Sequence, residues 1–481
     1  MHMYIHTDNT LLQTIAGLAV SSSVSMDAPA LGFVDMGAAH DAMRRLLVAE
    51  DTATASGSEE LATHILAFVA NDVRGRMAHP LMWHPTSEAK AHDLLLLVLD
   101  ALQAVHSAGC WPATLIFDGS GNNFGMVVTL WKSFGVKCPS TLLLCQRIMA
   151  TGSAIPHPFD AARRLSIIMD PSHLFKKIRN NVMSSAAEPK QGYARALNWC
   201  GFPIAWVQWW DALRWDCTTN SPRVYEILSA DHMLLDGRQK MRNHLADDVL
   251  DTRMLELMQA YAAASKRRDL DGTIAFIKAT SVLLTNLKGD KPYTSVDDPR
   301  LAESLDALAW FRLWQLAVLP SNLTPTERRE RAHCFLAEET WFALISAVRG
   351  FHTFVADHLK HNPGSEIVAS AASQDKTENL FGQLRSMGGD ATAPDVLKIS
   401  HSMGATLIAK ASIPSSRVHQ LHCNITPAIH GARQFTRTGR RMSSCLAAMR
   451  RDPAEREPDA ACCVSETRMH GTHASTSCMR E

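Results

Sequence analysis

The sequence predicts a mixed α/β fold in which a central β-sheet is interrupted by a large, mainly helical insertion domain. Two short apolar runs that end in an aspartate, Ala30–Asp35 and Ala113–Asp118, are typical of buried strands. A longer stretch with apolar residues at helical spacing, Ala89–Ala108, lies between them. Further along, residues 175–330 have a helical pattern and are rich in tryptophan, so we expect them to form the insertion.

Five strands and two helices are expected in the first part of the chain, in the order β-β-β-α-β-α-β. The strands are expected at Ala30–Asp35, Ile65–Ala70, Leu81–His84, Ala113–Asp118 and Leu165–Met169, and the helices at Ala89–Ala108 and Met126–Phe134. Pro80 suits the start of an edge strand, because proline cannot donate to a central ladder. Ser87 precedes the first helix and Gly109 follows it, as start and stop signals do.

Three carboxylates occupy positions from which they could act together. Asp35 and Asp118 end the first and fourth expected strands, and Glu378 lies in the helical pattern of Ser373–Gly382. Two aspartates at strand ends and a distant helical glutamate are how RNase H-like nucleases hold two divalent cations. The chemistry requires oxygen ligands, and Mg²⁺ ions about 3.5–4 Å apart stabilise the attacking and the leaving oxygen of a phosphodiester. The sequence therefore predicts an RNase H-like mixed sheet with a metal site at these carboxylates.

The composition is that of a globular protein. Of the 481 residues, 46% are hydrophobic and 20% charged, which suits about two to four domains. The 48 basic and 48 acidic residues cancel, which argues against a nonspecific nucleic-acid coat but allows a local basic groove. No apolar run is long enough for a membrane span, and the start has no secretory pattern. The 11 cysteines contain no C-x-x-C and predict reduced thiols in an intracellular compartment.

The segment 401–481 differs from the rest of the chain. It is basic, with little apolar periodicity, and we expect it to be a poorly ordered tail. Its cysteines and histidines fit no standard zinc spacing, so no zinc site is expected there.

Four strings occur in one order along the chain, and together they resemble the P-element transposases and their THAP-domain relatives. The strings are GFVDMG (32–37), FDGSGNN (117–123), MDPSHLFKKIRNN (169–181) and SQDKTENLFGQLRSMGG (373–389). The third and fourth are fairly specific, and the segment 338–351 is also similar to that family. The resemblance covers residues 28–400.

The resemblance implies a DDE-type transposase, which hydrolyses DNA strands at element ends and transfers the 3′ ends into target DNA. Matched motif to motif, the catalytic and metal-binding carboxylates are Asp35, Asp118 and Glu378, and the cofactor is a pair of Mg²⁺ ions. Asp375, one helical turn before Glu378, is implied as an auxiliary carboxylate. The family also implies a GTP-binding insertion, DNA as partner, a homo-oligomer in the active state, no membrane association and a nuclear location.

The expected organisation follows from these matches. It comprises an irregular N-terminus (1–27), the first part of the RNase H-like domain (28–174), the helical insertion (175–330), the last part with the catalytic helix (331–400) and the basic tail (401–481). No cysteine precedes Cys110, so the resemblance does not extend to the family's DNA-reading THAP zinc domain. No phosphate-loop motif occurs either, so GTP binding follows from the resemblance alone.

Plainer interpretations stand beside the functional ones. Asp35 and Asp118 could each end a strand at a turn or cap the next helix, and Glu378 could be a solvated helix residue. Asp170 could be a fourth metal-site carboxylate, but its place before Pro171 favours a helix cap.

The basic residues and the function class also leave alternatives. Candidates for DNA contact are Lys176, Lys177, Arg179 and Arg385, although such clusters are usually solvated helix faces. The rival to an active transposase is a domesticated or truncated, catalytically silent nuclear protein that binds DNA or protein. Intact carboxylates favour the enzyme, whereas the missing DNA-reading domain favours the silent derivative. A stand-alone nuclease has no supporting motif.

Overall fold

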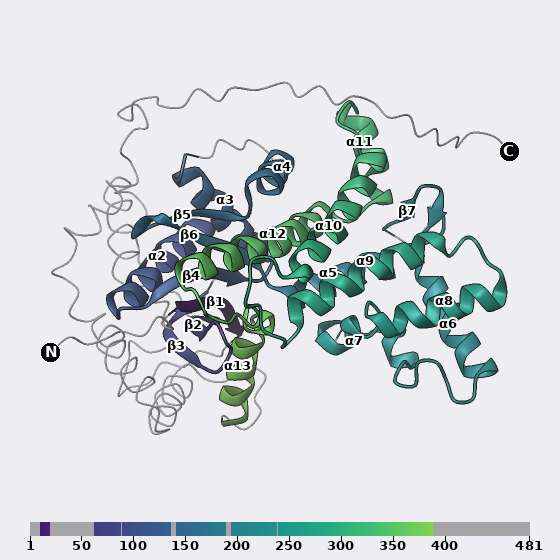
Figure 1. Cartoon of the computed structure of the whole chain (residues 1–481), viewed down its shortest axis with the longest axis horizontal. Helices are drawn as coiled ribbons and strands as arrows, with labels where there is room; N and C mark the ends of the chain where they lie inside the picture. Colours follow the sequence, from purple (N-terminus) through teal and green to yellow (C-terminus); the bar gives the residue numbers. More distant parts are fainter. Residues whose placement is uncertain are drawn as a thin grey trace. The chain divides into compact units, whose positions relative to one another are not determined.

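A six-stranded mixed sheet forms the centre of the structure (Figure 1). This computed structural model describes residues 10–19, 62–87, 89–135, 141–188, 194–237 and 239–387. The strands lie in the order β3-β2-β1-β4-β6-β5. Their bounds are β1 Thr10–Ala19, β2 His64–Asp72, β3 Ala78–Thr86, β4 Trp111–Phe117, β5 Ala154–His157 and β6 Asp160–Met169. β1, β4 and β6 are parallel neighbours, and β2, β3 and β5 add antiparallel strands at the two sides.

The first strand that the structure describes was not predicted from the sequence. β1, Thr10–Ala19, pairs with both β2 and β4, and Ile15 lies opposite Phe117. The segment 1–27, expected to be irregular, thus contains a central strand of the sheet. The expected strand Ala30–Asp35, and Asp35 with it, lies outside the described residues. Both runs are short and apolar, and which of them pairs with β4 depends on contacts far away in sequence, which periodicity does not reveal.

The other expected elements of the first part are confirmed. The four remaining strands appear as β2, β3, β4 and β6, and the two helices as α2 (Ala91–Ser107) and α3 (Gly121–Ser133). Strand β5 and helix α4 (Thr141–Thr151) were not expected. Asp170 is followed by α5 (Pro171–Met183), and Glu378 lies on α13 (Asp375–Met387).

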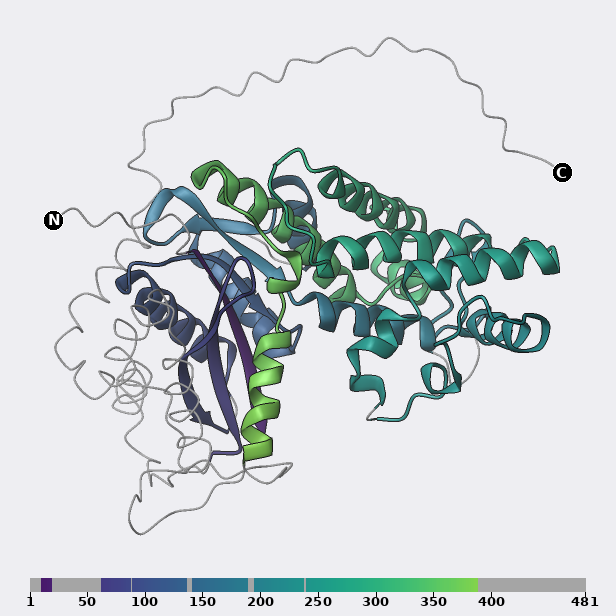
Figure 2. The same cartoon turned by 60° about the horizontal axis from the view of Figure 1, so that its bottom comes forward.

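Helices cover both faces of the sheet (Figure 2). On β2, alternate residues point to opposite faces, as they must in a strand. Leu66, Phe68 and Ala70 belong to the main core, which includes α2 and α3. Ile65, Ala67 and Val69 pack instead against the apolar side of α13, which consists of Leu380, Phe381 and Leu384.

Helix α12 (Glu338–His361) approaches β6 closely on the same face as α13. At Gly350 the helix lies so near the strand that an added Cβ would be 2.3 Å from the carbonyl oxygen of Ile167. One turn earlier, the hydroxyl of Ser346 donates to the same carbonyl at 3.1 Å and lies 3.1 Å from the hydroxyl of Ser153. Gly350 has no side chain, and the hydroxyl of Ser346 forms its hydrogen bond with the strand itself. Both features therefore let this helix pack directly on the backbone of the sheet.

The chain between α5 and α12 is mainly helical, as expected. Its elements are β7 (Asn198–Trp199), β8 (Phe202–Pro203), α6 (Trp206–Thr219), α7 (Asn243–Asp247), α8 (Thr252–Ser265), α9 (Asp271–Lys288), α10 (Pro299–Val318) and α11 (Pro325–Arg331). Within the described part of 220–310 no strand joins the six-stranded sheet. Its core is nevertheless continuous with that of the sheet, so the boundaries 175 and 330 stay predictions.

Tryptophans build much of this helical core. Trp209 and Trp314 are 0% exposed. Each indole N–H donates to a carbonyl, that of Val249 at 2.9 Å and that of Asn198 at 2.7 Å. Buried tryptophan needs such a partner, so packing accounts for these two residues. None of the helices in the described ranges is both long and apolar enough to cross a membrane.

Candidate active site at the carboxyl ends of β4 and β6

Two aspartates follow neighbouring parallel strands at the same edge of the sheet. Phe117 of β4 lies opposite Met169 of β6, and the next residue on each strand is Asp118 or Asp170. The N–H of Asp170 donates to the carbonyl of Phe117 at 3.0 Å, which continues the ladder to the strand ends. Since carboxyl ends of parallel strands meet at one edge, as in open α/β sheets where ligands bind, this edge is the candidate site.

Asp170 is an anchor between three parts of the chain. It is 1% exposed, and its Oδ2 accepts from the backbone N–H of His173 at 2.7 Å and from the His173 ring Nδ1 at 2.9 Å. Its Oδ1 accepts from the N–H of Gln374, just before α13, at 2.7 Å. The helix-cap interpretation is therefore confirmed. Both oxygens of Asp170 accept hydrogen bonds from protein N–H groups. In this geometry Asp170 therefore holds α5 and the start of α13 together, and a role as an auxiliary metal ligand stays a prediction.

We expect Asp170→Asn to destabilise the fold by about 3 kcal/mol, because breaking a buried, fully bonded charge pair leaves a partner unpaired. An amide keeps one acceptor, but its NH₂ group would face the two donors of His173. Urea unfolding of both proteins measures the difference. Equal stability at pH about 5.5 would contradict this role for Asp170.

The stability difference should also depend on pH. Burial would raise the pKa of Asp170, but the bonds from His173 and Gln374 hold it below its usual 3.8. Burial would lower the pKa of His173, but Asp170 raises it above the usual 6.5. The Asp170 contribution is therefore lost as pH falls through its lowered pKa, and the His173 contribution as pH rises through its raised pKa. The excess stability over Asp170→Asn should be largest between pH about 4 and about 6.5, and smaller at pH about 9.

Glu378 lies close to this anchor on α13. Its Oε1 is 3.6 Å from Nε2 of His173, and the Glu378 side chain is 40% exposed. The same side of α13 borders a broad, open depression lined by Glu378, Asn379, Gly382, Gln383 and Ser386. Glu378 is thus held at its inner side by His173, and its outer side is open to a large substrate.

Asp118 caps the turn that leads into α3 while keeping part of its carboxylate available. Its Oδ1 accepts from the N–H of Ser120 at 2.9 Å and from the side-chain amide of Asn123 at 2.6 Å. Ser120 is itself the N-cap of α3. Among the described residues, Oδ2 of Asp118 and Oε2 of Glu378 accept no hydrogen bond. Two free carboxylate oxygens are the hard donors that Mg²⁺ prefers, so the donor set suits this ion.

The second carboxylate of α13 has a different neighbourhood. Oδ1 of Asp375 accepts from the amide of Asn243, on α7, at 3.2 Å. Asp247 lies nearby on α7 and forms an ion pair with Lys288 at 2.5 Å. Burial raises the pKa of Asp247, Lys288 opposes this shift, and the charge of Asp375 adds to it. Asp375 therefore faces the helical region, whereas Glu378 faces α5.

The basic residues of α5 are mostly buried, contrary to the expectation that they contact DNA. Arg179 is 0% exposed, donates to the carbonyl of Lys240 at 2.6 Å and has its pKa lowered to about 10 by burial. Lys176 is 6% exposed. The helical region covers these side chains, which a run of basic residues does not reveal. Arg385 is half-buried on α13, and its Nε donates to the carbonyl of Phe381 at 3.3 Å.

Lys177, the third of these residues, lies beside Asp118. Its ammonium donates to the carbonyl of Gly119 at 2.7 Å. Burial lowers the pKa of Lys177, and the charges of Glu339 and Asp118 act in the opposite direction. Sequence reasoning identified Lys177 but not this role. It also missed the link from His173 to Glu378. The spacing of four between His173 and Lys177, which places both on one side of a helix, is the signal that was available.

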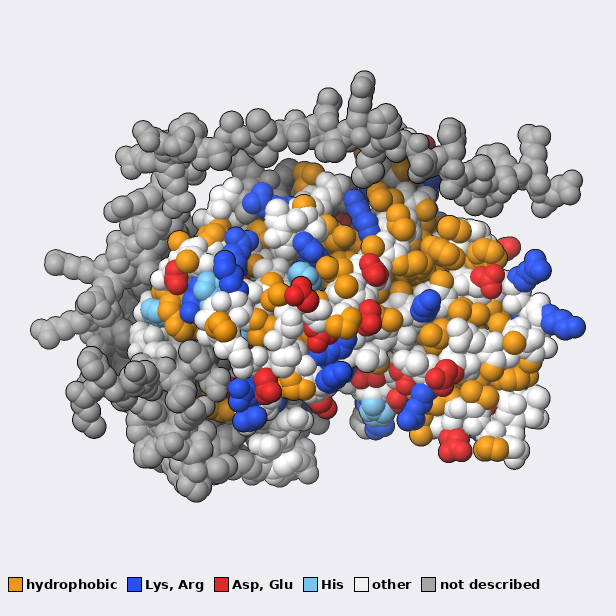
Figure 3. Space-filling view, in the orientation of Figure 1, with side chains coloured by type: hydrophobic (Ala, Val, Ile, Leu, Met, Phe, Trp, Pro, Cys, Tyr) orange, Lys and Arg blue, Asp and Glu red, His pale blue; other side chains and the backbone are white. Residues whose placement is uncertain are grey.

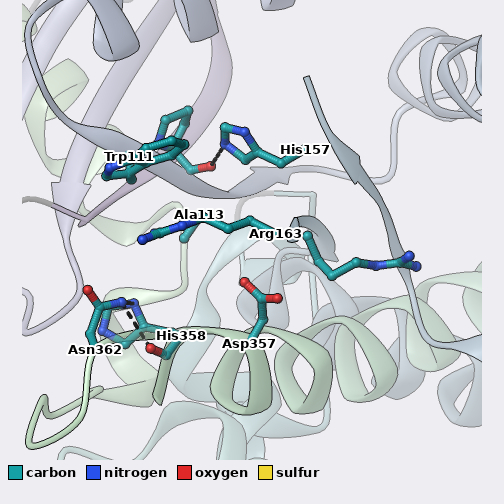
Figure 4. A pocket seen from close by; sticks show the side chains of 9 residues that line it. Trp111, Ala113, His157, Arg163, Asp357, His358 and Asn362 are labelled. Carbon is teal, nitrogen blue, oxygen red and sulfur yellow. Dashed lines mark hydrogen bonds between the residues drawn. The ribbon is translucent and has the colours of Figure 1, made fainter. Parts of the chain in front are cut away.

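A small cavity at the other end of β4 is a packing defect rather than a second site (Figure 4). It has a volume of about 10 Å³ and is lined by residues that include Trp111, His157 and Asp357. Nε2 of His157 is 3.1 Å from the carbonyl of Pro112, and burial lowers the pKa of His157 to about 4. This volume holds at most about one water.

Asp118 and Asp170 thus follow neighbouring strands at this edge, and Glu378 lies beside His173, which binds Asp170, whereas Asp35 lies outside the described residues. Within those residues, no three His, Cys, Asp or Glu side chains are grouped so that they could hold a metal ion.

Comparison with known proteins gives one structural relative. No protein-family model and no curated protein matches the sequence. Among solved structures, the chain is similar to the Drosophila P element transposase in its strand transfer complex, with a TM-score of 0.60 and 14% sequence identity. The match covers 86% of this chain and 80% of that chain. At this identity the similarity concerns the fold alone, and the chain has a transposase-like fold.

Proposed function

We propose that the protein is a P-element-type DNA transposase that cleaves and joins DNA strands through Asp35, Asp118 and Glu378. The observation that carries the proposal is that Asp118 and Asp170 end neighbouring strands and that Glu378, far away in sequence, lies beside His173, which binds Asp170. The strand order, with three parallel strands flanked by antiparallel ones, supports an RNase H-like sheet. The transposase-like fold supports the reaction class.

Asp118 and Glu378, together with Asp35, would hold two Mg²⁺ ions. Such ions supply a stabilised nucleophile and a charge partner for the leaving oxygen. The chain's own residues do the positioning. Ser120 and Asn123 fix one oxygen of Asp118, and the other accepts no hydrogen bond from the described residues. The open side of α13 would give DNA access to Glu378, and Arg385, further along the same helix, is a candidate phosphate contact.

Further properties implied by the family are also proposals. GTP would bind in the helical region, and a titration with labelled GTP tests this.

Self-association is supported by exposed apolar side chains on α10, since Leu313 and Leu316 are 66% and 41% exposed. Figure 3 has hydrophobic side chains gathered over the helices at its right. Sedimentation velocity measures the oligomeric state. A nuclear location agrees with DNA as the substrate.

A silent DNA-binding derivative is the second candidate, and one observation favours it. Of the two described strands that pair with β4, β1 (Thr10–Ala19) contains no carboxylate. A two-metal site of the expected kind takes a ligand from that strand, so Asp35 would have to reach the edge from elsewhere. The two candidates differ in a single measurable property, which is metal-dependent cleavage.

We expect the chain of residues 1–481 to nick duplex DNA in Mg²⁺ or Mn²⁺, and EDTA should abolish the reaction. Binding to unrelated duplexes should be similar and should weaken steeply between two salt concentrations, because phosphate contacts position a protein without reading bases. Binding without nicking in either metal would reject the enzyme and favour the silent derivative. Tight, salt-insensitive preference for one duplex would contradict the expected binding mode.

A further inference from the structure

One side of helix α5 carries three polar residues at helical spacing, His173, Lys177 and Asn181. Positions four apart lie above one another on a helix, so these residues form a continuous row. Each of them bonds to a different part of the chain near the candidate site. The row therefore links elements that are separated by up to about two hundred residues in sequence.

His173 links α5 to α13. Its Nδ1–H donates to Asp170 at 2.9 Å, because an ionised carboxylate only accepts. This bond fixes the ring so that Nε2 faces Oε1 of Glu378 at 3.6 Å. The His173 side chain is 24% exposed and the Asp170 side chain 0%, so the imidazole ring is attached to a fully buried carboxylate. Glu378 is thereby held at a defined distance from the strand ends.

Lys177 links α5 to the turn that contains Asp118. Its ammonium donates to the carbonyl of Gly119 and lies so close to Gly119 that an added Cβ there would be 2.2 Å from Nζ. Gly119 thus leaves room for the ammonium in the position that it occupies. The positive charge lies near the carboxylates of Asp118 and Glu339 and favours their charged forms.

Asn181 fixes the other end of the row against α12. Its side-chain amide donates to the hydroxyl of Thr340 at 3.0 Å, and its oxygen accepts from the N–H of Ala337 at 2.8 Å. Ala337 is the N-cap residue of α12, whose own side chain cannot cap. Asn181 is 8% exposed. The row is therefore attached to the body of the protein at the end away from the carboxylates.

We propose that α5 is a positioning helix for the candidate active site, in which His173 holds Glu378 and Lys177 holds the Asp118 turn. That the positioned site is an active site rests on the proposed function, whereas the contacts of His173 and Lys177 do not depend on it. Neither residue is catalytic. Each acts on a carboxylate that would bind metal, and outer residues of this kind typically change metal affinity by about 10-fold to 100-fold.

The test uses the whole chain of residues 1–481 with matched substitutions. His173→Asn keeps a donor at the position of Nδ1, toward Asp170, and removes Nε2, toward Glu378. Lys177→Met keeps the length of the stem and removes the ammonium. His352→Asn on α12 and Lys132→Met on the exposed side of α3 make the same chemical changes elsewhere. Amide hydrogen exchange is measured without metal, and Mn²⁺ affinity by paramagnetic resonance.

In His173→Asn, exchange of the first-turn amides of α13 should be at least about 10-fold faster, since local opening is no longer opposed. In Lys177→Met the same increase should occur at Ser120–Asn123. Mn²⁺ affinity should fall about 10-fold in both variants, and Lys177→Arg should recover most of it. Nicking, where the wild type nicks, should return toward the wild-type rate at high Mn²⁺.

If amide exchange in the first turn of α13 and at Ser120–Asn123 is as slow in the variants as in the controls, α5 does not position these two elements. A wild type that binds no Mn²⁺ would reject the proposed metal chemistry, but the exchange measurement would still decide whether α5 positions the two elements. If His173→Asn does not fold, Lys177→Met and Lys177→Arg carry the decision at the Asp118 turn.

Discussion

Asp118→Asn is expected to reduce metal-dependent nicking by more than about 100-fold while leaving the fold intact. Residues that only support metal ligands already cost about 10-fold to 100-fold when changed, and a lost ligand should cost more. The asparagine oxygen can still accept from Ser120 and Asn123, so the turn into α3 keeps its hydrogen bonds. Single-turnover nicking in Mn²⁺ measures the effect, and DNA binding should change little.

Asp306→Asn is the matched control for this change. Asp306 is exposed on α10, so the same loss of one negative charge occurs away from the sheet edge. The control should nick at the wild-type rate. If Asp118→Asn also nicks at that rate, Asp118 only caps the turn, and the assignment of the carboxylate edge as an active site is wrong.

The strands that carry the site were predictable where they are buried on both faces. β4 and the buried end of β6, Leu165–Met169, appear in the sequence as short, mainly apolar runs, as parallel strands do, and each is followed by an aspartate. The first strand was not predictable in the same way. Thr10–Ala19 is similar in apolar character to the expected strand Ala30–Asp35, and its place in the sheet follows from its pairing with β2 and β4. Such pairing is a property of the whole sheet.

The partners of the site residues were also beyond the sequence. The bond between Asp170 and Gln374 joins positions 204 residues apart. It depends on how α12 leads the chain back to the sheet, which no local pattern encodes. In the same way, the sequence of the basic residues Lys176, Lys177 and Arg179 is equally compatible with a solvated helix and with a buried one. Burial of Arg179 follows from the position of Lys240, in the helical region.

Helix α5 explains why the sheet and the helical region share one core. Arg179 bonds to the helical region, Asn181 to α12, and His173 to the anchor beneath α13. On α13 itself, Asp375 bonds to Asn243 of α7. The helical region therefore contacts both α5, through Arg179, and α13, through Asp375.

The largest effect on stability is expected from Gly350, where α12 packs on the backbone of β6. An alanine Cβ would lie 2.3 Å from the carbonyl oxygen of Ile167 and 3.0 Å from the side chain of Ile168. A backbone carbonyl in a central strand cannot move aside without breaking its ladder. Overpacking of a core costs about 1–3 kcal/mol, and often more against backbone. Alanine gains about 1 kcal/mol of helix propensity, which is too little to offset this clash.

Gly350→Ala should therefore lower the free energy of unfolding by about 2 kcal/mol or more, and Gly350→Val should prevent folding. Gly382→Ala is the matched control, because it makes the same change inside α13, where a Cβ would meet nothing within 4 Å. Without a clash, only propensity acts, so Gly382→Ala should be neutral or up to about 1 kcal/mol more stable than wild type. Urea unfolding of the wild type and of the two alanine variants separates the cost of the clash from the gain in helix propensity. If both alanine variants gain stability, α12 does not rest on β6 as closely as the structure requires.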